Sequence, residues 1–164
     1  MSKNKFKKPN NSAKFQIIYG LHAVKAALLN NKRSHDELLI LENFKKIADS
    51  FKSKIKKITI LDQKNFKKLY GSEKSTQGII LKTNDFERPS LGQFLKNENL
   101  NEKSVLIALD QITDPQNIGS IMRSCALFNC KGIIVAKNNA PNLTPSLYKA
   151  ASGAVEVVNY FRVT

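Results

Sequence analysis

The sequence predicts an α/β protein built from two domains. Short apolar runs alternate with segments whose apolar residues recur at helical spacing, which indicates strands and helices in turn. A polar segment containing Pro, Gly and several Asn residues, 85–103, interrupts this alternation and is typical of a linker. The apolar run VLIAL after it is followed by a helical pattern and then by GIIV, the order of a parallel βαβ unit. We therefore expect a small alternating α/β domain over 16–84, a linker over 85–103 and a parallel-sheet domain over 104–164.

The elements of the first domain follow from periodicity. In order along the chain, the patterns predict a helix over 21–30, a strand over 37–41, a helix over 43–53 and strands over 57–61 and 78–82. Between the last two strands, Asp62 stands where a helix N-cap belongs and Gly71 where a C-cap belongs. In the linker, Leu91, Phe94 and Leu95 have the spacing of a short helix.

The second domain is expected to begin with a strand over 105–110. In the helix that follows, the predicted apolar side comprises Ile118, Ile121, Met122, Cys125 and Phe128. Gly132 is expected to end that helix before a strand over 133–136. Thr144 and Pro145 form an N-cap and first-turn pair for a helix that runs to Gly153. A last strand is expected over 155–163, and the strands should be parallel.

The charge is strongly positive and unevenly distributed. The chain of 164 residues has 27 basic and 13 acidic side chains, for a net charge of +14. Residues 1–103 hold 22 basic and 10 acidic side chains, whereas residues 104–164 hold 5 and 3. Such an excess favours a polyanionic partner, nucleic acid before an anionic membrane, although a merely solubilising surface is the alternative. The first domain should therefore face the polyanion.

The basic tail, 1–15, has the composition of a disordered segment. It is either a solubilising extension or an arm for nucleic-acid phosphates. It lacks the apolar core of a secretory signal, and the chain has no long apolar stretch that would predict a membrane span. Cys125 and Cys130 lack metal-ligand spacing, so we expect no metal site and a reducing, cytoplasmic compartment.

The stretch DPQNIGSIMRS, 114–124, combines helix-start residues with polar groups at the carboxyl end of a predicted strand. Asp114 and Pro115 suit an N-cap and the first helical position, and Gly119 allows a close approach of backbone or ligand. Asn117 brings a donor and an acceptor near the helix start, and Arg123 projects from the polar face. Ligands of open α/β sheets bind at this edge. Taken singly, each residue also fits an ordinary amphipathic helix with a solvated Arg.

Taken together, the residues show a family resemblance. LDQITDPQNIGSIMRSCALFNCKGIIV followed by KAASGAVEVV resembles the first block of the SpoU/TrmH family of RNA ribose 2′-O-methyltransferases, within the SPOUT superfamily. YGLHAVKAAL and STQGIIL are similar to the start and end of the substrate-binding domain in the RlmB-like branch. Thr76 departs from the His that often precedes Gln-Gly there.

The resemblance implies transfer of a methyl group from S-adenosylmethionine to a ribose 2′-hydroxyl of RNA, with 23S ribosomal RNA as the expected substrate. It implies that Arg123 is the catalytic arginine and that Asn117 positions the ribose or the arginine. Glu156 also matches a family position, where we expect a structural partner. The family builds its cofactor site in a knot formed by two later motifs. Residues 104–164 therefore resemble only the first part of the parallel-sheet α/β-knot methyltransferase domain, with the knot itself missing.

These features lead to further expectations about the chain. It is expected to be an N-terminal fragment, truncated at the C-terminus and inactive alone, with cofactor-binding residues beyond Thr164. The alternative is a non-catalytic RNA-binding protein derived from the family. The resemblance implies a homodimer for the full-length protein, and the fragment is not expected to form it. Residues 17–83 are expected to fold independently, whereas residues 104–164 should be marginally stable alone.

Overall fold

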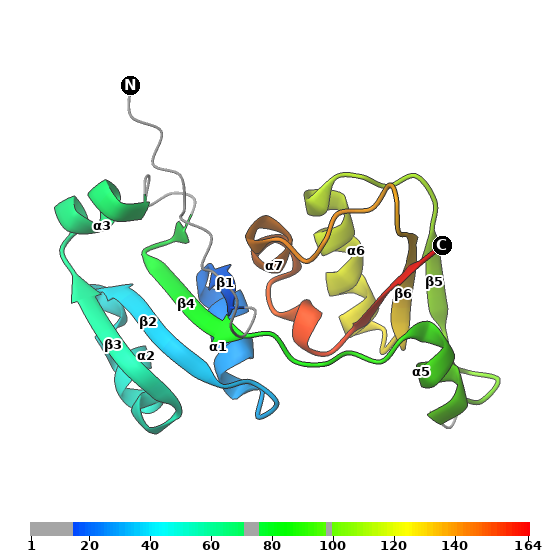
Figure 1. Cartoon of the computed structure of the whole chain (residues 1–164), viewed down its shortest axis with the longest axis horizontal. Helices are drawn as coiled ribbons and strands as arrows, with labels where there is room; N and C mark the ends of the chain where they lie inside the picture. Colours follow the sequence, from blue (N-terminus) through cyan, green and yellow to red (C-terminus); the bar gives the residue numbers. More distant parts are fainter. Residues whose placement is uncertain (1–14, 71–75, 98–99) are drawn as a thin grey trace.

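The structure is a computed structural model that describes residues 15–70, 76–97 and 100–164. The expected basic tail therefore lies almost wholly outside the described residues, as does Gly71. Two sheets form the framework: a four-stranded sheet in the order β1-β4-β2-β3 and a three-stranded sheet in the order β5-β6-β7 (Figure 1). We call residues 15–84 the first domain and residues 104–164 the second domain.

The first domain alternates strands and helices as predicted, with one additional strand. Its elements are β1 (Phe15–Tyr19), α1 (Leu21–Leu29), β2 (His35–Leu41), α2 (Lys45–Ser50), β3 (Ile55–Leu61), α3 (Gln63–Tyr70) and β4 (Ile79–Asn84). Short 3-10 turns, Glu42–Phe44 and Lys52–Lys54, flank α2 and divide the single helix expected there. β2 and β3 are parallel, whereas β4 is antiparallel to both β2 and β1.

Alternating burial explains why helices cover both faces of this sheet. Leu38 and Ile40 of β2 pack on one face with α1 and α2, in a core that includes Val24. The next residues of the strand, Leu39 and Leu41, face the other side, where they pack against Phe66 and the rest of α3. Asp62 caps α3 as expected, since its carboxylate accepts a hydrogen bond from the amide of Asn65 at 2.7 Å.

The second domain contains the predicted parallel strands. Its elements are β5 (Leu106–Leu109), α6 (Pro115–Leu127), β6 (Gly132–Ala136), α7 (Pro145–Ala151) and β7 (Asn159–Val163). Both pairs of neighbouring strands are parallel. The expected short helix of the linker is α5 (Leu91–Asn97), whose Phe94 packs on Phe161 of β7 with ring centroids 5.1 Å apart.

Three details of the second domain were predicted wrongly. The last strand starts at Asn159, because Ser152 and Gly153 both adopt left-handed backbone and Ala154–Glu156 then forms a 3-10 turn. Gly132 opens β6, and α6 ends at Leu127. Phe128 is 76% exposed, since it follows the last helical residue and no longer shares the apolar face.

The two domains share one hydrophobic core. α7 lies against β1 and α1 in the middle of the molecule (Figure 1). One continuous cluster of buried side chains therefore includes Val24 and Leu28 of α1 together with Leu147 and Tyr148 of α7. Within the described residues, no helix has the length and apolar character needed to cross a bilayer.

Candidate functional site

The DPQNIGSIMRS stretch opens α6 with the predicted cap. Asp114 accepts a hydrogen bond from the amide of Gln116 at 2.9 Å, and Pro115 occupies the first helical position. Asn117 and Arg123 are both exposed, Arg123 as expected from its place on the polar side of the helix. The cap thus fixes where α6 begins and which side chains it presents.

Arg123 lies in a groove between the domains. This interdomain groove, of about 320 Å³, is lined by nine residues: Gly20, His22, Ala23 and Gln77 from the first domain, and Gln116, Arg123, Lys149, Ala150 and Ser152 from the second. Asn117 is not among them. Asn117 and Arg123 are six positions apart in the helix, which places them about 120° apart around its axis. The structure therefore puts only one of the two predicted site residues in the groove, next to Gln116.

The first-domain wall is formed by residues of YGLHAVKAAL and STQGIIL, the two stretches that resemble the substrate-binding domain. The side-chain oxygen of Gln77 accepts a hydrogen bond from the amide of Leu21 at 2.9 Å, which ties Gln77 to the start of α1. Gly20 has a φ of 91° and Gln77 a φ of 57°. A Cβ at Gly20 would lie 3.1 Å from Cγ of Lys149, so a glycine lets the two domains approach at this point. Backbone in such sparsely populated regions is often concentrated at functional sites.

The second-domain wall depends on close packing between α6 and α7. A Cβ added at Gly119 would lie 2.5 Å from Cβ of Ala150 and 2.8 Å from the backbone nitrogen of Ala151. The expected role of Gly119 in a close approach is therefore confirmed, and the neighbour is helix backbone. This contact sets Arg123 on α6 beside Lys149 on α7.

A buried ion pair joins the domains at the end of β1 opposite to the groove. Nε and Nη2 of Arg33 donate to the two carboxylate oxygens of Glu156 at 2.8 and 2.9 Å, and the side chains of the pair are 0% and 4% exposed. Asn30 donates to the same carboxylate at 2.6 Å. Burial alone would lower the pKa of Arg33, but the hydrogen bond and the charge of Glu156 raise it overall. Glu156 is therefore a partner of the first domain in this structure.

Tyr148 extends this network across the seam. Its hydroxyl donates to the side-chain oxygen of Gln16 at 2.7 Å and accepts from Arg33 at 3.0 Å and from Arg88 at 3.2 Å. Burial raises the pKa of Tyr148, so the phenol stays protonated at neutral pH. Arg33 also lies over the ring of Phe86, 4.8 Å from its centroid. Sequence reasoning missed Arg33, Gln16 and Tyr148, because their partners lie far away along the chain.

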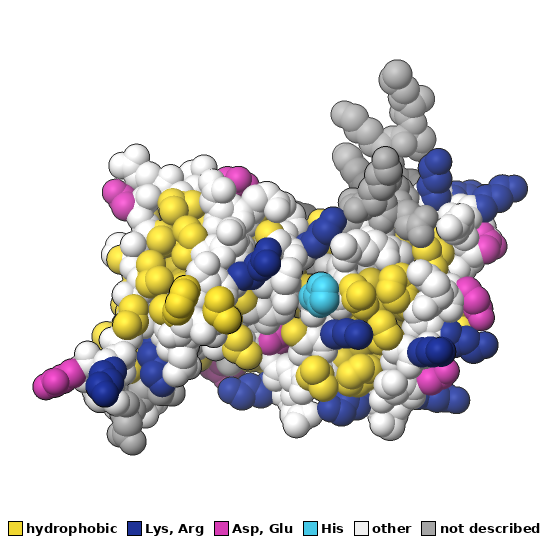
Figure 2. Space-filling view, turned by 180° about the vertical axis from the view of Figure 1, so that it is seen from behind, with side chains coloured by type: hydrophobic (Ala, Val, Ile, Leu, Met, Phe, Trp, Pro, Cys, Tyr) yellow, Lys and Arg dark blue, Asp and Glu magenta, His cyan; other side chains and the backbone are white. Residues whose placement is uncertain are grey.

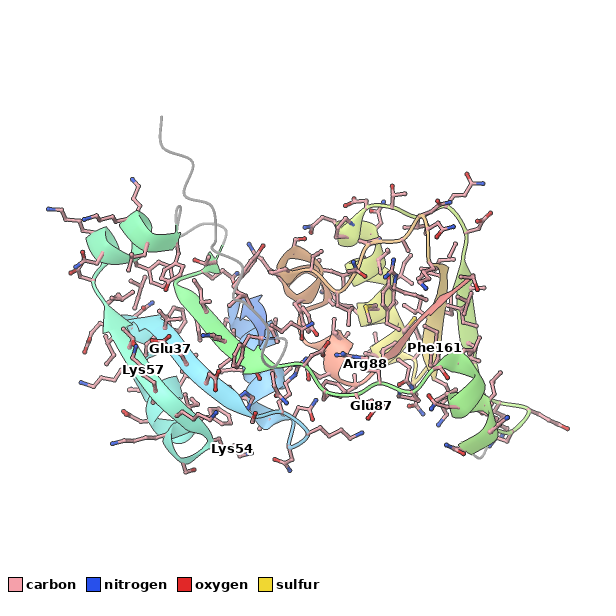
Figure 3. The ribbon with its side chains drawn as sticks, viewed as in Figure 1. Glu37, Lys54, Lys57, Glu87, Arg88 and Phe161 are labelled. Carbon is pink, nitrogen blue, oxygen red and sulfur yellow. The ribbon has the colours of Figure 1, made fainter. Side chains whose placement is uncertain are left out.

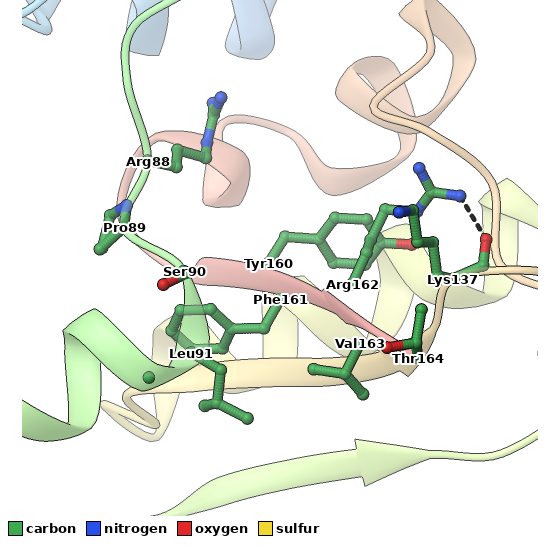
Figure 4. Close-up of a pocket in the computed structure, with 11 residues that line it drawn as sticks. Arg88, Pro89, Ser90, Leu91, Lys137, Tyr160, Phe161, Arg162, Val163 and Thr164 are labelled. Atoms are coloured by element: carbon green, nitrogen blue, oxygen red, sulfur yellow. Dashed lines mark hydrogen bonds between the residues drawn. The ribbon is translucent and has the colours of Figure 1, made fainter.

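A second, larger hollow of about 420 Å³ lies along β7, between the connecting segment 88–92 and the carboxyl end of β6 (Figure 4). Its walls include Lys137, Thr164 and, from the connecting segment, Arg88. Figure 4 shows Arg162 donating to the carbonyl of Lys137. Arg123 does not line this hollow, so we assign the candidate site to the interdomain groove despite its smaller volume.

The cysteines are buried or half-buried thiols without a disulfide. Cys125 is fully buried on α6, and burial raises its pKa to about 11, so it carries no thiolate at neutral pH. Among the described residues, no three His, Cys, Asp or Glu side chains come together as metal ligands.

Both domains match families of known proteins. Residues 17–89 match the family model described as RNA 2′-O ribose methyltransferase substrate binding, and residues 104–164 match the SpoU rRNA Methylase family. A Staphylococcus aureus protein named as a TrmH family tRNA/rRNA methyltransferase is 32% identical over 90% of this chain, which spans 61% of that protein. The 23S rRNA (guanosine-2′-O-)-methyltransferase RlmB of Acinetobacter baylyi is 29% identical over 93% of this chain, which covers 63% of it.

Solved structures agree on the fold. The crystal structure of an RNA 2′-O ribose methyltransferase matches 92% of this chain with a TM-score of 0.70 at 16% identity, and the chain covers 55% of it. The AdoMet-bound rRNA methyltransferase of Sinorhizobium meliloti matches 90% of this chain with a TM-score of 0.68 at 19% identity, and 54% of that protein is covered. The resemblance drawn from the sequence is thereby confirmed: the chain contains a SpoU substrate-binding domain followed by a SpoU methylase segment.

Proposed function

We propose that the protein carrying this chain is an RNA ribose 2′-O-methyltransferase that uses S-adenosylmethionine and acts on 23S ribosomal RNA. The relatives named RlmB support this substrate, and the S. meliloti neighbour with bound AdoMet supports the cofactor. One observation carries the proposal: Arg123 and the first-domain segments that match the substrate-binding model line the same groove. A target nucleotide held there contacts both domains at once.

The proposed chemistry follows from what a guanidinium can do. The reaction would join the ribose 2′-oxygen to a methyl group supplied by S-adenosylmethionine, leave the demethylated cofactor, and release the hydroxyl proton to solvent. A ribose hydroxyl is a poor nucleophile until its developing negative charge is stabilised. Arg123 suits this role because its donors are planar and permanently charged. We propose that Asn117, at the start of the same helix, positions the ribose, although its side chain does not line the groove. S-adenosylmethionine supplies the electrophilic methyl group when bound.

Several finer statements belong to the same proposal. Residues 16–84 serve as the RNA-binding part, residues 104–164 belong to the catalytic domain, and the cofactor site lies beyond Thr164. The whole protein forms a homodimer in the cytoplasm. Exposed apolar side chains on the second domain, including Leu127 at 80% and Val157 at 72%, support self-association.

Methyl transfer by the whole protein to 23S ribosomal RNA tests the catalytic proposal. Arg123→Ala should abolish transfer of a labelled methyl group, because the developing alkoxide loses its stabilising charge, while RNA affinity changes little. Ser124→Ala is the matched control, since Ser124 is the next exposed residue of α6 and does not line the groove. Wild-type turnover of the Arg123 variant would remove this residue from the mechanism.

The same methyl-transfer assay distinguishes the enzyme from the alternative, a non-catalytic RNA-binding protein. It requires RNA binding with no methyl transfer by the whole protein. Calorimetry of the 164-residue chain with S-adenosylmethionine tests where the cofactor binds. No binding is expected, and micromolar binding would contradict a cofactor site beyond Thr164.

A further inference from the structure

The lysines of the first domain are not equally available to a polyanion. Lys57 pairs with Glu37 at 2.7 Å across β3 and β2, where Figure 3 shows the two side chains together. Lys56 pairs with Asp36 at 2.8 Å on the same two strands. Each of these cations already has a carboxylate beside it, which weakens the field that it presents to solvent.

The lysines of α3 differ from these pairs. Lys64, Lys67 and Lys68 are exposed and stand three and four residues apart, so they share one face of the helix. Phe66, on the opposite face, is 1% exposed and packs on the sheet, which fixes the direction of the lysine face. None of the three lysines forms an ion pair with another described residue. Figure 2 shows basic side chains gathered over α3.

The α3 lysine face lies at the same edge of the sheet as the interdomain groove. β1, β2 and β3 run in one direction, because β2 and β3 are parallel and β4 is antiparallel to both β1 and β2. Their carboxyl ends therefore meet at one edge, where α3 follows β3 and Gly20 follows β1 (Figure 1). β4 begins at this edge, directly after Gln77 and Gly78. An extended polyanion that leaves the groove past Gln77 thus meets α3.

We propose that the α3 lysine face binds the phosphate backbone of the RNA substrate next to the segment held in the interdomain groove. The inference rests on RNA being the substrate and identifies the surface that anchors it. Phosphate contacts of this kind fix the position and register of a nucleic acid and carry no sequence preference. They also make affinity fall steeply with salt, because each neutralised phosphate releases counterions.

Salt dependence of RNA binding by the 164-residue chain tests the proposal. The variant Lys64→Gln/Lys67→Gln/Lys68→Gln keeps residues that favour helix and removes three charges. Its dissociation constant for a short single-stranded RNA of mixed sequence is measured between roughly 50 and 200 mM salt. The slope of log affinity against log salt should become shallower by about 2, at about 0.7 for each lost contact. Binding at the lowest salt should weaken on the order of 10- to 100-fold.

The matched control removes the same charge from the opposite face of the sheet. Lys45→Gln/Lys46→Gln/Lys52→Gln alters exposed lysines on and beside α2, whose core contacts lie on the α1 side. This control should bind with nearly the wild-type slope. Equal losses in both triple variants, or a wild-type slope in the α3 variant, would overturn the inference. Failure of the unaltered chain to bind any RNA would instead contradict its proposed RNA partner.

Discussion

Gly119 illustrates how one residue sets the geometry of the groove. Its missing side chain allows α6 to approach the backbone of α7, and a methyl group there would meet atoms 2.5 to 2.8 Å away. Because two of these atoms belong to the backbone of Ala150 and Ala151, a side-chain rotation cannot relieve the clash. Gly119→Ala should therefore destabilise the fold by about 1–3 kcal/mol, as overpacking of a core does.

Gly92→Ala is the matched control for that substitution. Gly92 lies in α5, and a Cβ there has no heavy atom within 4 Å. Since alanine favours helix over glycine, this variant should gain up to about 1 kcal/mol. Urea unfolding of both variants measures the difference. A Gly119 variant as stable as the wild type would show that the helices separate at little cost.

At the scale of single elements, locally encoded features were predicted well. Asp114 and Thr144 cap their helices through amides two and three residues ahead, so the signal lies within one turn of chain. β1 was missed, because its short run FQIIY adjoins a polar, basic segment and is stabilised by distant β4. Only one wall of the groove was predicted from the sequence. Arg123 followed from its motif, whereas its position opposite Gln77 depends on how the domains pack.

β2 also carries a buried histidine that should make stability depend on pH. His35 is 2% exposed; its Nδ1 lies 3.0 Å from the Thr83 hydroxyl, and its Nε2 has no partner among the described residues. The Thr83 hydroxyl donates to the carbonyl of Ser34 and so accepts from Nδ1, which leaves Nε2 unprotonated. Burial, then the charges of Arg33 and Lys54, lower the pKa of His35.

The direction of the pH effect follows from that lowered pKa. As pH falls through about 6.5, the unfolded chain binds a proton at His35 that the folded chain does not, so stability is lost. Thermal unfolding should therefore show a lower midpoint at about pH 5.5 than at pH 7.5. His35→Gln should flatten this dependence, whereas His22→Gln, at an exposed histidine, should leave it unchanged. Parallel pH profiles for the wild type and the His35 variant would contradict the assignment.

At the scale of the whole molecule, the seam between the domains contains both apolar and ionic contacts. The sequence suggested independent folding of residues 17–83, because residues 104–164 lack the later helices that would cover their parallel sheet and should be marginal alone. The continuous core and the Arg33–Glu156 pair instead favour unfolding of both domains in one transition. Calorimetry of the 164-residue chain distinguishes these outcomes, since independent folding of the first domain gives two transitions.

Glu156→Gln tests how strongly the ion pair holds the seam. The substitution leaves the Arg33 guanidinium buried without a countercharge, which should cost about 3–5 kcal/mol in unfolding free energy. The loss should uncouple the domains, so that the single transition splits, the second domain unfolds first and limited proteolysis cuts residues 104–164 earlier. Lys45→Gln breaks the exposed pair with Glu42 and should change stability by less than about 1 kcal/mol. If Glu156→Gln unfolds as the wild type does, the apolar packing and the remaining hydrogen bonds of the seam hold the domains together without the ion pair.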